Sequence, residues 1–280
     1  MRPTGKAGVV SILGVLTALA IAWTTAGNAQ GRGGQGRGGA AAQQAPPQRI
    51  SVAVAQVKPD MVGTYQDLIK NELIPALKKA GVQYRWTWTN TAMGGTGFTF
   101  AAVQPVTSYA QYDQPNPAQR AMGDAAFATY NAKLRATLVS THTTISTLRQ
   151  DLSIQSNSPA APPLLQLQTI QIAAGKGAEF TSLMTTDYLP NYRKAGVKDF
   201  WAYAINFGAP GGQIVTARAL SKFADLDATP GLLQKAGLSP EAAAQINAKR
   251  GAITTLLQND VVRYVPELSF GSPTTRPGTQ

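Results

Sequence analysis

The sequence predicts an α+β fold in which two copies of a β-α-β-β-α-β unit pack their antiparallel sheets face to face as a barrel. Three observations predict it: a long internal repeat, strand-like alternation at matching places in both copies, and apolar residues at helical spacing between those strands. The repeat is clearest where the segment Pro75–Val82 returns 115 residues downstream as Pro190–Val197. A period of this length indicates a duplicated domain, because solenoid repeats are much shorter.

The first copy covers residues 50–155. Alternating β-branched residues predict a strand at 50–57, and apolar residues at helical spacing predict a helix that ends at Gly81 and is interrupted at Pro75. The later elements are two strands forming a hairpin at 83–89 and 98–103, a mainly helical segment at 117–149 and a short last strand at 151–155.

The second copy covers residues 165–271 and repeats this order. Its expected elements are a strand at 165–172, a helix at 177–195, a hairpin of strands at 200–205 and 213–219, a helix at 240–258 and a strand at 263–270. Residues 156–164, rich in Ser, Ala and Pro, are expected to link the copies, and 272–280 to form a flexible tail.

The N-terminal 49 residues have a composition of their own. Residues 1–29 combine a basic start, an apolar stretch and small residues before Ala29, which predicts a secretory signal peptide; an uncleaved membrane anchor is the alternative. Residues 30–49 are rich in Gly, Ala, Gln and Pro, which predicts a disordered linker rather than an arginine-glycine tail that binds nucleic acid. We therefore expect an exported protein, periplasmic or secreted.

Charge and cysteine content exclude several functions. The net charge is +11, but five basic residues and no acid lie in residues 1–49, which leaves +6 (11 − 5) for the rest, without a basic run that would indicate nucleic acid. The chain has no cysteine, so disulfides, thiol nucleophiles and thiolate metal sites are excluded. No spacing of His, Asp and Glu indicates a metal site.

Several stretches carry a family resemblance. The matching features are the first strand, the stretch Gly177–Phe180, the Leu189-Pro190 pair inside a helix, the turn Ala195–Val197 and the aromatic strand that follows. In these features the chain resembles the dimeric α/β-barrel (ferredoxin-like) superfamily, in particular its NIPSNAP-like branch. The resemblance covers about residues 50–270 and implies two ferredoxin-like repeats, here in one chain. Members of that superfamily include cofactor-free monooxygenases, haem proteins, isomerases and domains with no known activity.

His142 is the only histidine of the chain. It falls on the apolar side of the helix expected at 117–149, where it is a packed histidine or, as the haem-binding relatives imply, an axial haem ligand. The second copy has Gln258 in its place, which favours the packed residue. We expect no cofactor.

Aromatic strands supply the main candidates for ligand binding. Trp86 and Trp88 share one face of a strand, as do Trp201 and Tyr203 in the second copy, so they line a cavity between the sheets or form ordinary core. Polar candidates at matching strand ends are Gln56 with Gln171 and Gln104 with Arg218. Arg85 lies opposite the tryptophans, and it needs an anionic partner if it points into the barrel.

These residues predict a protein that binds a small, largely apolar or aromatic molecule between its sheets, without metal. One alternative is a cofactor-independent monooxygenase or isomerase, as the resemblance implies; another is a non-catalytic envelope interaction module. The expected assembly is a monomeric pseudo-dimer or a homodimer.

Overall fold

The computed structural model describes residues 48–156, 158, 160–227 and 231–272. The expected signal peptide, residues 30–47 of the expected linker and the tail from 273 lie outside the described residues. Within the described part, no helix is long and apolar enough to cross a membrane.

The element order β-α-β-β-α-β occurs twice along the chain. The strands are β1 (Arg49–Val57), β2 (Trp86–Asn90), β3 (Thr99–Val106), β4 (Leu138–Leu148), β5 (Leu164–Ile172), β6 (Phe200–Phe207), β7 (Gln213–Leu220) and β8 (Thr254–Tyr264). The helices are α1 (Val62–Leu68), α2 (Ile74–Lys79), α3 (Pro117–Met122), α4 (Asp124–Thr137), α5 (Gly177–Leu183), α6 (Leu189–Lys194), α7 (Leu232–Lys235) and α8 (Pro240–Ile253).

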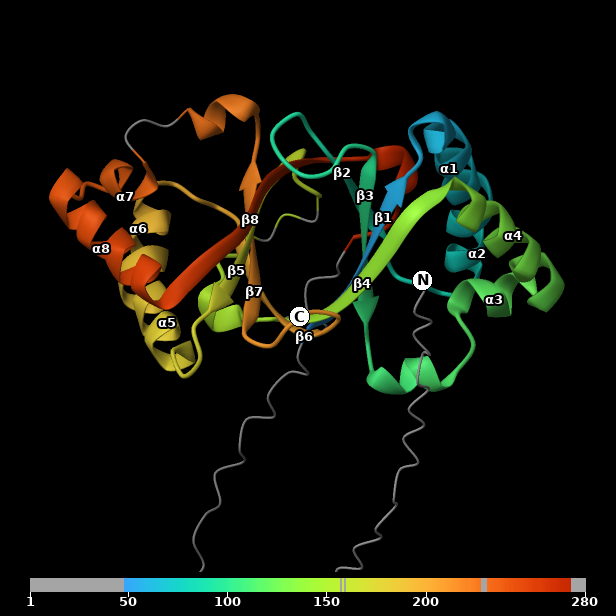
Figure 1. The fold of residues 1–280 in the computed structure, drawn as a ribbon, viewed down its shortest axis with the longest axis horizontal. Helices are drawn as coiled ribbons and strands as arrows, with labels where there is room; N and C mark the ends of the chain where they lie inside the picture. Colours follow the sequence, from blue (N-terminus) through green and yellow to red (C-terminus); the bar gives the residue numbers. More distant parts are fainter. Residues whose placement is uncertain (1–47, 157, 159, 228–230, 273–280) are drawn as a thin grey trace, which may run out of the picture. The chain divides into compact units, whose positions relative to one another are not determined.

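The strands form one closed antiparallel barrel in the order β1-β3-β2-β8-β5-β7-β6-β4. Each copy contributes a ferredoxin-like sheet, β4-β1-β3-β2 or β8-β5-β7-β6, and the sheets join where β2 pairs with β8 and β4 pairs with β6. The predicted fold class is therefore confirmed, and the barrel closes within one chain. Helices α1 to α4 lie against the first sheet and α5 to α8 against the second (Figure 1).

Both proline interruptions are confirmed as π-helical turns. A π-helical turn at Ile69–Leu73 separates α1 from α2, and another at Met184–Tyr188 separates α5 from α6. Pro75 and Pro190 each follow such a turn after one intervening residue. Proline has no N–H and its ring clashes with the carbonyl four residues earlier, so a wider turn accommodates it within a continuous helix.

The barrel interior holds a packed aromatic cluster. Trp88 pairs with Tyr264 and Trp201 with Ala217, and paired residues on antiparallel strands share a face. Phe100 and Phe200 stand next to inward-facing positions on their strands, so they face the outside of the barrel, where they pack with the helices. The interior cluster therefore consists of Trp86, Trp88, Val103, Leu165, Leu167, Trp201, Ala217, Ala219, Val262 and Tyr264.

The predicted end of the last helix in each copy is wrong. The helix expected at 117–149 stops at Thr137 and β4 takes over, while the helix expected at 240–258 stops at Ile253 and β8 takes over. The strands expected at 151–155 and 263–270 are short isolated bridges at Ile154 and Phe270, each preceded by a 3₁₀ turn, at Gln150–Leu152 and Pro266–Leu268. Residues 138–148 are dominated by Val, Ile, Thr and Ser, whose strand preference outweighs a chance helical spacing of apolar residues.

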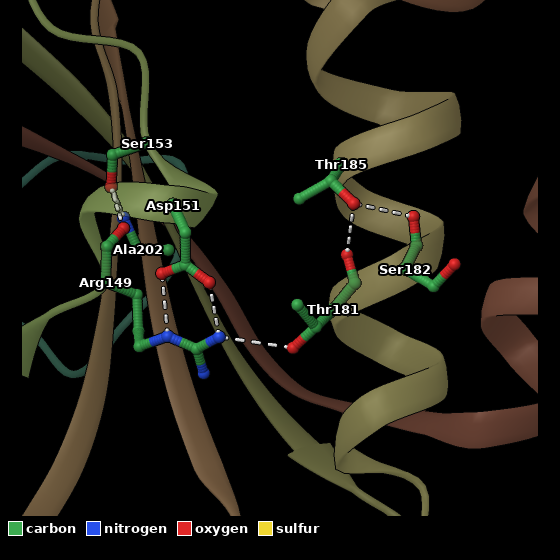
Figure 2. Close-up of polar contacts among 7 residues, drawn as sticks. All are labelled: Arg149, Asp151, Ser153, Thr181, Ser182, Thr185 and Ala202. Carbon is green, nitrogen blue, oxygen red and sulfur yellow. Dashed lines mark hydrogen bonds and ion pairs between the residues drawn. The ribbon is translucent and has the colours of Figure 1, made fainter. Parts of the chain in front are cut away.

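The connection after β4 is tied to the second copy by side-chain hydrogen bonds (Figure 2). Arg149 Nε and Nη2 donate to the two carboxylate oxygens of Asp151 at 2.9 and 2.6 Å, and Nη2 also donates to Thr181 Oγ1 of α5 at 3.2 Å. Ser153 Oγ accepts from the Ala202 backbone N–H of β6 at 3.0 Å. These contacts fix the end of the first copy against the helix and sheet of the second.

Candidate binding site

A pocket of about 520 Å³ lies between the outer face of β5 and β7 and the helices of the second copy. Its polar lining comes mainly from Gln166, Gln168, Tyr188, Thr216, Arg218, Asp225, Asn247 and Arg250. Its apolar lining includes Tyr192, Phe200, Leu226, Leu232, Leu233 and Ala243. A pocket that combines apolar walls with polar groups is suited to a small organic molecule that carries both.

Arg218 enters the pocket from the sheet. Alternation along β7 places it on the outer face, because its neighbour Ala217 faces the barrel interior. Its Nε and Nη2 donate to Gln166 Oε1 at 3.1 and 2.8 Å. Burial lowers the pKa of Arg218, and Tyr192 and Asp225 partly offset this. Two bonds to Gln166 leave further N–H donors of the guanidinium for a ligand.

Arg250 enters from the opposite wall, on α8. Its guanidinium carbon lies 5.3 Å from the ring centroid of Tyr188, a cation–π contact. The Tyr188 hydroxyl donates to Asn247 Oδ1 at 2.8 Å, one turn before Arg250 on the same helix face. Burial raises the pKa of Tyr188 to about 12, partly offset by Arg250, so the phenol stays neutral at neutral pH.

The pocket carries an excess of positive charge. Asp225 is the one carboxylate among its lining residues, and its Oδ2 accepts from the backbone N–H groups of Ser221 and Lys222 at 2.7 and 3.1 Å. Among the described residues, neither Arg218 nor Arg250 forms an ion pair with a carboxylate. Both guanidinium groups therefore remain available for an anionic group of a ligand.

The first copy does not build this pocket. When the two copies are aligned by the sequence repeat, the first copy has leucines at the positions of Tyr188, Tyr192 and Arg250. The three leucines are Leu73, Leu77 and Leu134. All of them pack in the apolar cores of the first copy. The polar pocket is thus a departure of the second copy from the shared pattern.

Among the residues predicted to bind a ligand, Arg218 alone lines this pocket. Trp86, Trp88 and Trp201 belong to the interior cluster, and Tyr203 pairs with Val215 on the same inner face. The remaining four residues lie apart from one another. Gln56 accepts from Ser140, Gln171 donates to Gly211, Gln104 of β3 pairs with Ser51 of β1, and Arg85 is buried on the outer face of the first sheet.

His142 does not lie on a helix. It is an exposed residue of β4 opposite Val54, so its expected position on a helix is wrong. Because the chain has no other histidine, the pocket offers no imidazole as an axial haem ligand. The described residues hold no cluster of three or more His, Asp or Glu side chains suited to a metal ion.

Tyr188, Asn247 and Arg250 were not among the predicted site residues. A signal for them exists in the sequence: at two of these positions a polar or aromatic residue replaces a leucine of the other copy. Distinguishing such a change from an ordinary surface residue requires knowing which helix face meets the sheet.

Comparison with known proteins identifies the fold. No family model and no curated protein matches the sequence. Among solved structures, an anthrone oxidase-like protein matches with a TM-score of 0.54 at 10% identity, over 78% of this chain and 91% of that chain. The chain has the dimeric α/β-barrel fold.

Other solved structures are similar to this α/β barrel at lower scores. A chlorite dismutase mutant from Candidatus Nitrospira defluvii has a TM-score of 0.48 at 10% identity, over 79% of this chain and 92% of that chain. A NIPSNAP family protein from Agrobacterium tumefaciens has a TM-score of 0.30 at 14% identity, over 36% of this chain and 86% of that chain.

Proposed function

We propose that this α/β barrel binds a small organic anion with an apolar body in the pocket of the second copy. The observation that carries the proposal is the pair Arg218 and Arg250, which approach one pocket of mixed polar and apolar lining from opposite walls without a carboxylate partner among the described residues. Guanidinium groups bind carboxylates through charge-assisted hydrogen bonds, which are stronger than neutral ones. Aromatic and aliphatic side chains around them suit the apolar body of such a ligand.

The sheet and the helices have different roles in this proposal. Gln166 holds the Arg218 guanidinium by accepting two hydrogen bonds, so this donor group is positioned before a ligand arrives. Tyr188 supports Arg250 through its ring and is itself held by Asn247. Nothing in this arrangement requires bond making, so we propose binding rather than catalysis.

A pair of probes of the same shape tests the proposal. Calorimetric titration with 2-naphthoate and with the neutral 2-naphthamide compares the same ring system with and without a charge. We expect the carboxylate to bind wild-type protein at least about tenfold more tightly, since a hydrogen bond to a charged group contributes about 1.5–3 kcal/mol. Equal affinity for the two probes, or no binding of either, contradicts the proposal.

The matched variants are R250L and K249L. The first places the residue of the other copy, Leu134, in the pocket, while the second removes a neighbouring cation on the exposed side of α8. We expect R250L to lose most of the preference for naphthoate and K249L to keep it. Equal losses in both would indicate a general effect of surface charge.

A non-catalytic interaction module is the second candidate, because the barrel interior is occupied by side chains and large apolar groups lie outside. Phe207 is 58% exposed and stacks edge-on with Tyr109 at 5.6 Å between ring centroids. Sedimentation velocity tests it: self-association of the wild-type protein that F207S abolishes supports this candidate, and a monomer at all concentrations weighs against self-association.

We also propose that the protein acts after export. The basic and apolar stretch before Ala29 supports this. The intact mass of protein purified from an exporting host is expected to correspond to a chain that begins near Gln30. A mass that includes Met1 would contradict cleavage and favour a retained anchor.

A further inference from the structure

Arg85 is a buried cation in the first copy. It lies just before β2 and is tied to Phe270 by two backbone hydrogen bonds of 2.9 and 2.8 Å. Because the next residue, Trp86, faces the barrel interior, Arg85 points to the outer face of the sheet, which the helices of the first copy cover (Figure 1). Only 6% of its surface is exposed.

No side chain of the protein neutralises this charge. Arg85 forms no ion pair with any carboxylate in the described residues, and all fourteen Asp and Glu residues of the sequence lie in that part of the chain. Glu72, the acid whose charge acts on the neighbouring Tyr130, pairs with Lys133 at 3.1 Å near the surface. A buried charge without a partner is costly, so a counter-charge is expected from outside the chain.

Two phenols accompany Arg85 and cannot supply that charge. Tyr65 of α1 and Tyr130 of α4 are buried in the same copy, and the charge of the guanidinium acts to lower the pKa of each. Burial raises the pKa of Tyr65 and of Tyr130, so both stay protonated at neutral pH. The buried Nε of Arg85 and the buried hydroxyl of Tyr130 have no hydrogen-bond partner among the described residues.

We propose that the first copy holds a small monovalent anion, such as chloride, between Arg85 Nε and the Tyr130 hydroxyl. Both groups donate a hydrogen bond, and an anion accepts both while offsetting the guanidinium charge. A water molecule could accept the bonds but would leave the charge uncompensated. This site is independent of the pocket in the second copy, where Phe200 stands at the position equivalent to Arg85 and packs in an apolar core.

Bromide provides a direct test, because it replaces chloride and scatters anomalously. In crystals of the wild-type protein grown with sodium bromide, we expect an anomalous peak beside Arg85 Nε and the Tyr130 hydroxyl. Y130F removes one donor with little change in volume, so it should fold and show a weaker peak. A wild-type crystal with only water there, or with Glu72 turned onto Arg85, overturns the proposal.

Thermal unfolding gives the second readout. With sodium gluconate holding the ionic strength constant, we expect the Tm of the wild-type protein to rise by roughly 5 °C or more as chloride increases to about a hundred times its dissociation constant. Y130F should show a smaller rise, and R120M, which removes an exposed arginine of the same copy, should behave as wild type. A Tm that does not depend on chloride overturns the proposal.

Discussion

The guanidinium of Arg250 lies over the ring of Tyr188, 5.3 Å from its centroid, at positions where the first copy has Leu134 and Leu73. The leucine pair packs in an apolar core of the first copy, whereas the Arg250–Tyr188 pair lines a polar pocket in the second. The two copies have the same order of helices and strands, so this order does not explain the difference. The side chains on the helices decide which copy has the polar pocket beside its sheet.

A substitution at Trp88 distinguishes a ligand bound between the sheets from a ligand bound in the pocket of the second copy. It is 5% exposed in the interior cluster, away from the pocket. We expect W88A to lower the free energy of unfolding by about 3–5 kcal/mol, measured with urea, because it leaves a large cavity. The affinity of the folded variant for naphthoate should stay within about threefold of wild type, well under the tenfold that 1.4 kcal/mol represents.

The control for W88A is Y112A, which removes a ring that is 52% exposed and should change the stability little. If W88A abolishes naphthoate binding while the protein remains folded, the ligand lies between the sheets. That result would favour the tryptophans as the binding residues.

Gly208 is required by the turn between β6 and β7. Its φ is +87°, and a Cβ at this position would overlap the backbone oxygen of Thr143. We expect G208A to destabilise the protein by at least about 1 kcal/mol in urea denaturation. G211A, in the same turn with open space around its Cα, should cost less. Equal effects would show that the turn tolerates a side chain at Gly208.

The ion pair of Arg149 with Asp151 predicts a dependence of stability on acidity. The hydrogen bond from Arg149 lowers the pKa of Asp151, so the folded protein holds the carboxylate more firmly ionised than the unfolded chain does. This stability is present above the ordinary pKa of aspartate, about 4, and is lost as the pH falls through the lowered pKa.

The effect should be small, because the pair is half exposed and screened by solvent. Urea denaturation between about pH 6 and 3 is expected to show a shallower acid loss for D151N than for wild type. In the R149M background, the same substitution should no longer change the slope. A steeper loss in D151N would be opposite to the predicted sign.

Tyr84 predicts a loss of stability in alkali. Burial raises its pKa from 10.0 to about 12. Between these values the folded protein keeps a proton that the unfolded chain has lost, so the stabilisation is complete below pH 10 and disappears as the pH rises toward about 12. The full difference corresponds to about 3 kcal/mol. Denaturation of Y84F should show a weaker alkaline loss, whereas equal slopes would indicate an ordinary pKa in the fold.

The sequence was sufficient to predict the barrel because strand alternation and glycine-rich turns are local signals. The segments that became β1, β3, β5 and β7 show it clearly, and Pro75 and Pro190 marked the interruption in both first helices. The ends of α4 and α8 could not be predicted in the same way. Residues 138–148 have a local preference for a strand, but their hydrogen-bond partners on β1 and β6 lie far away in sequence, so the apolar spacing alone did not reveal where α4 ends.

The site was less predictable for a related reason. Tryptophans are conspicuous in a sequence, but here Trp86 and Trp201 fill the interior of the barrel. The pocket depends on which helix positions meet the outer face of β5 and β7, and on Tyr188 standing where Leu73 stands in the other copy. Arg218 was found because it sits at a strand end, while Arg250 lies on a helix whose buried face only the folded barrel defines.

A crystal structure of the wild-type protein with bound 2-naphthoate tests the central claim most directly. We predict that the ring system lies in the pocket of the second copy, with its carboxylate within hydrogen-bonding distance of the Arg218 or Arg250 guanidinium. Naphthoate between the sheets beside Trp86 and Trp201, with the pocket occupied only by solvent, would contradict the claim.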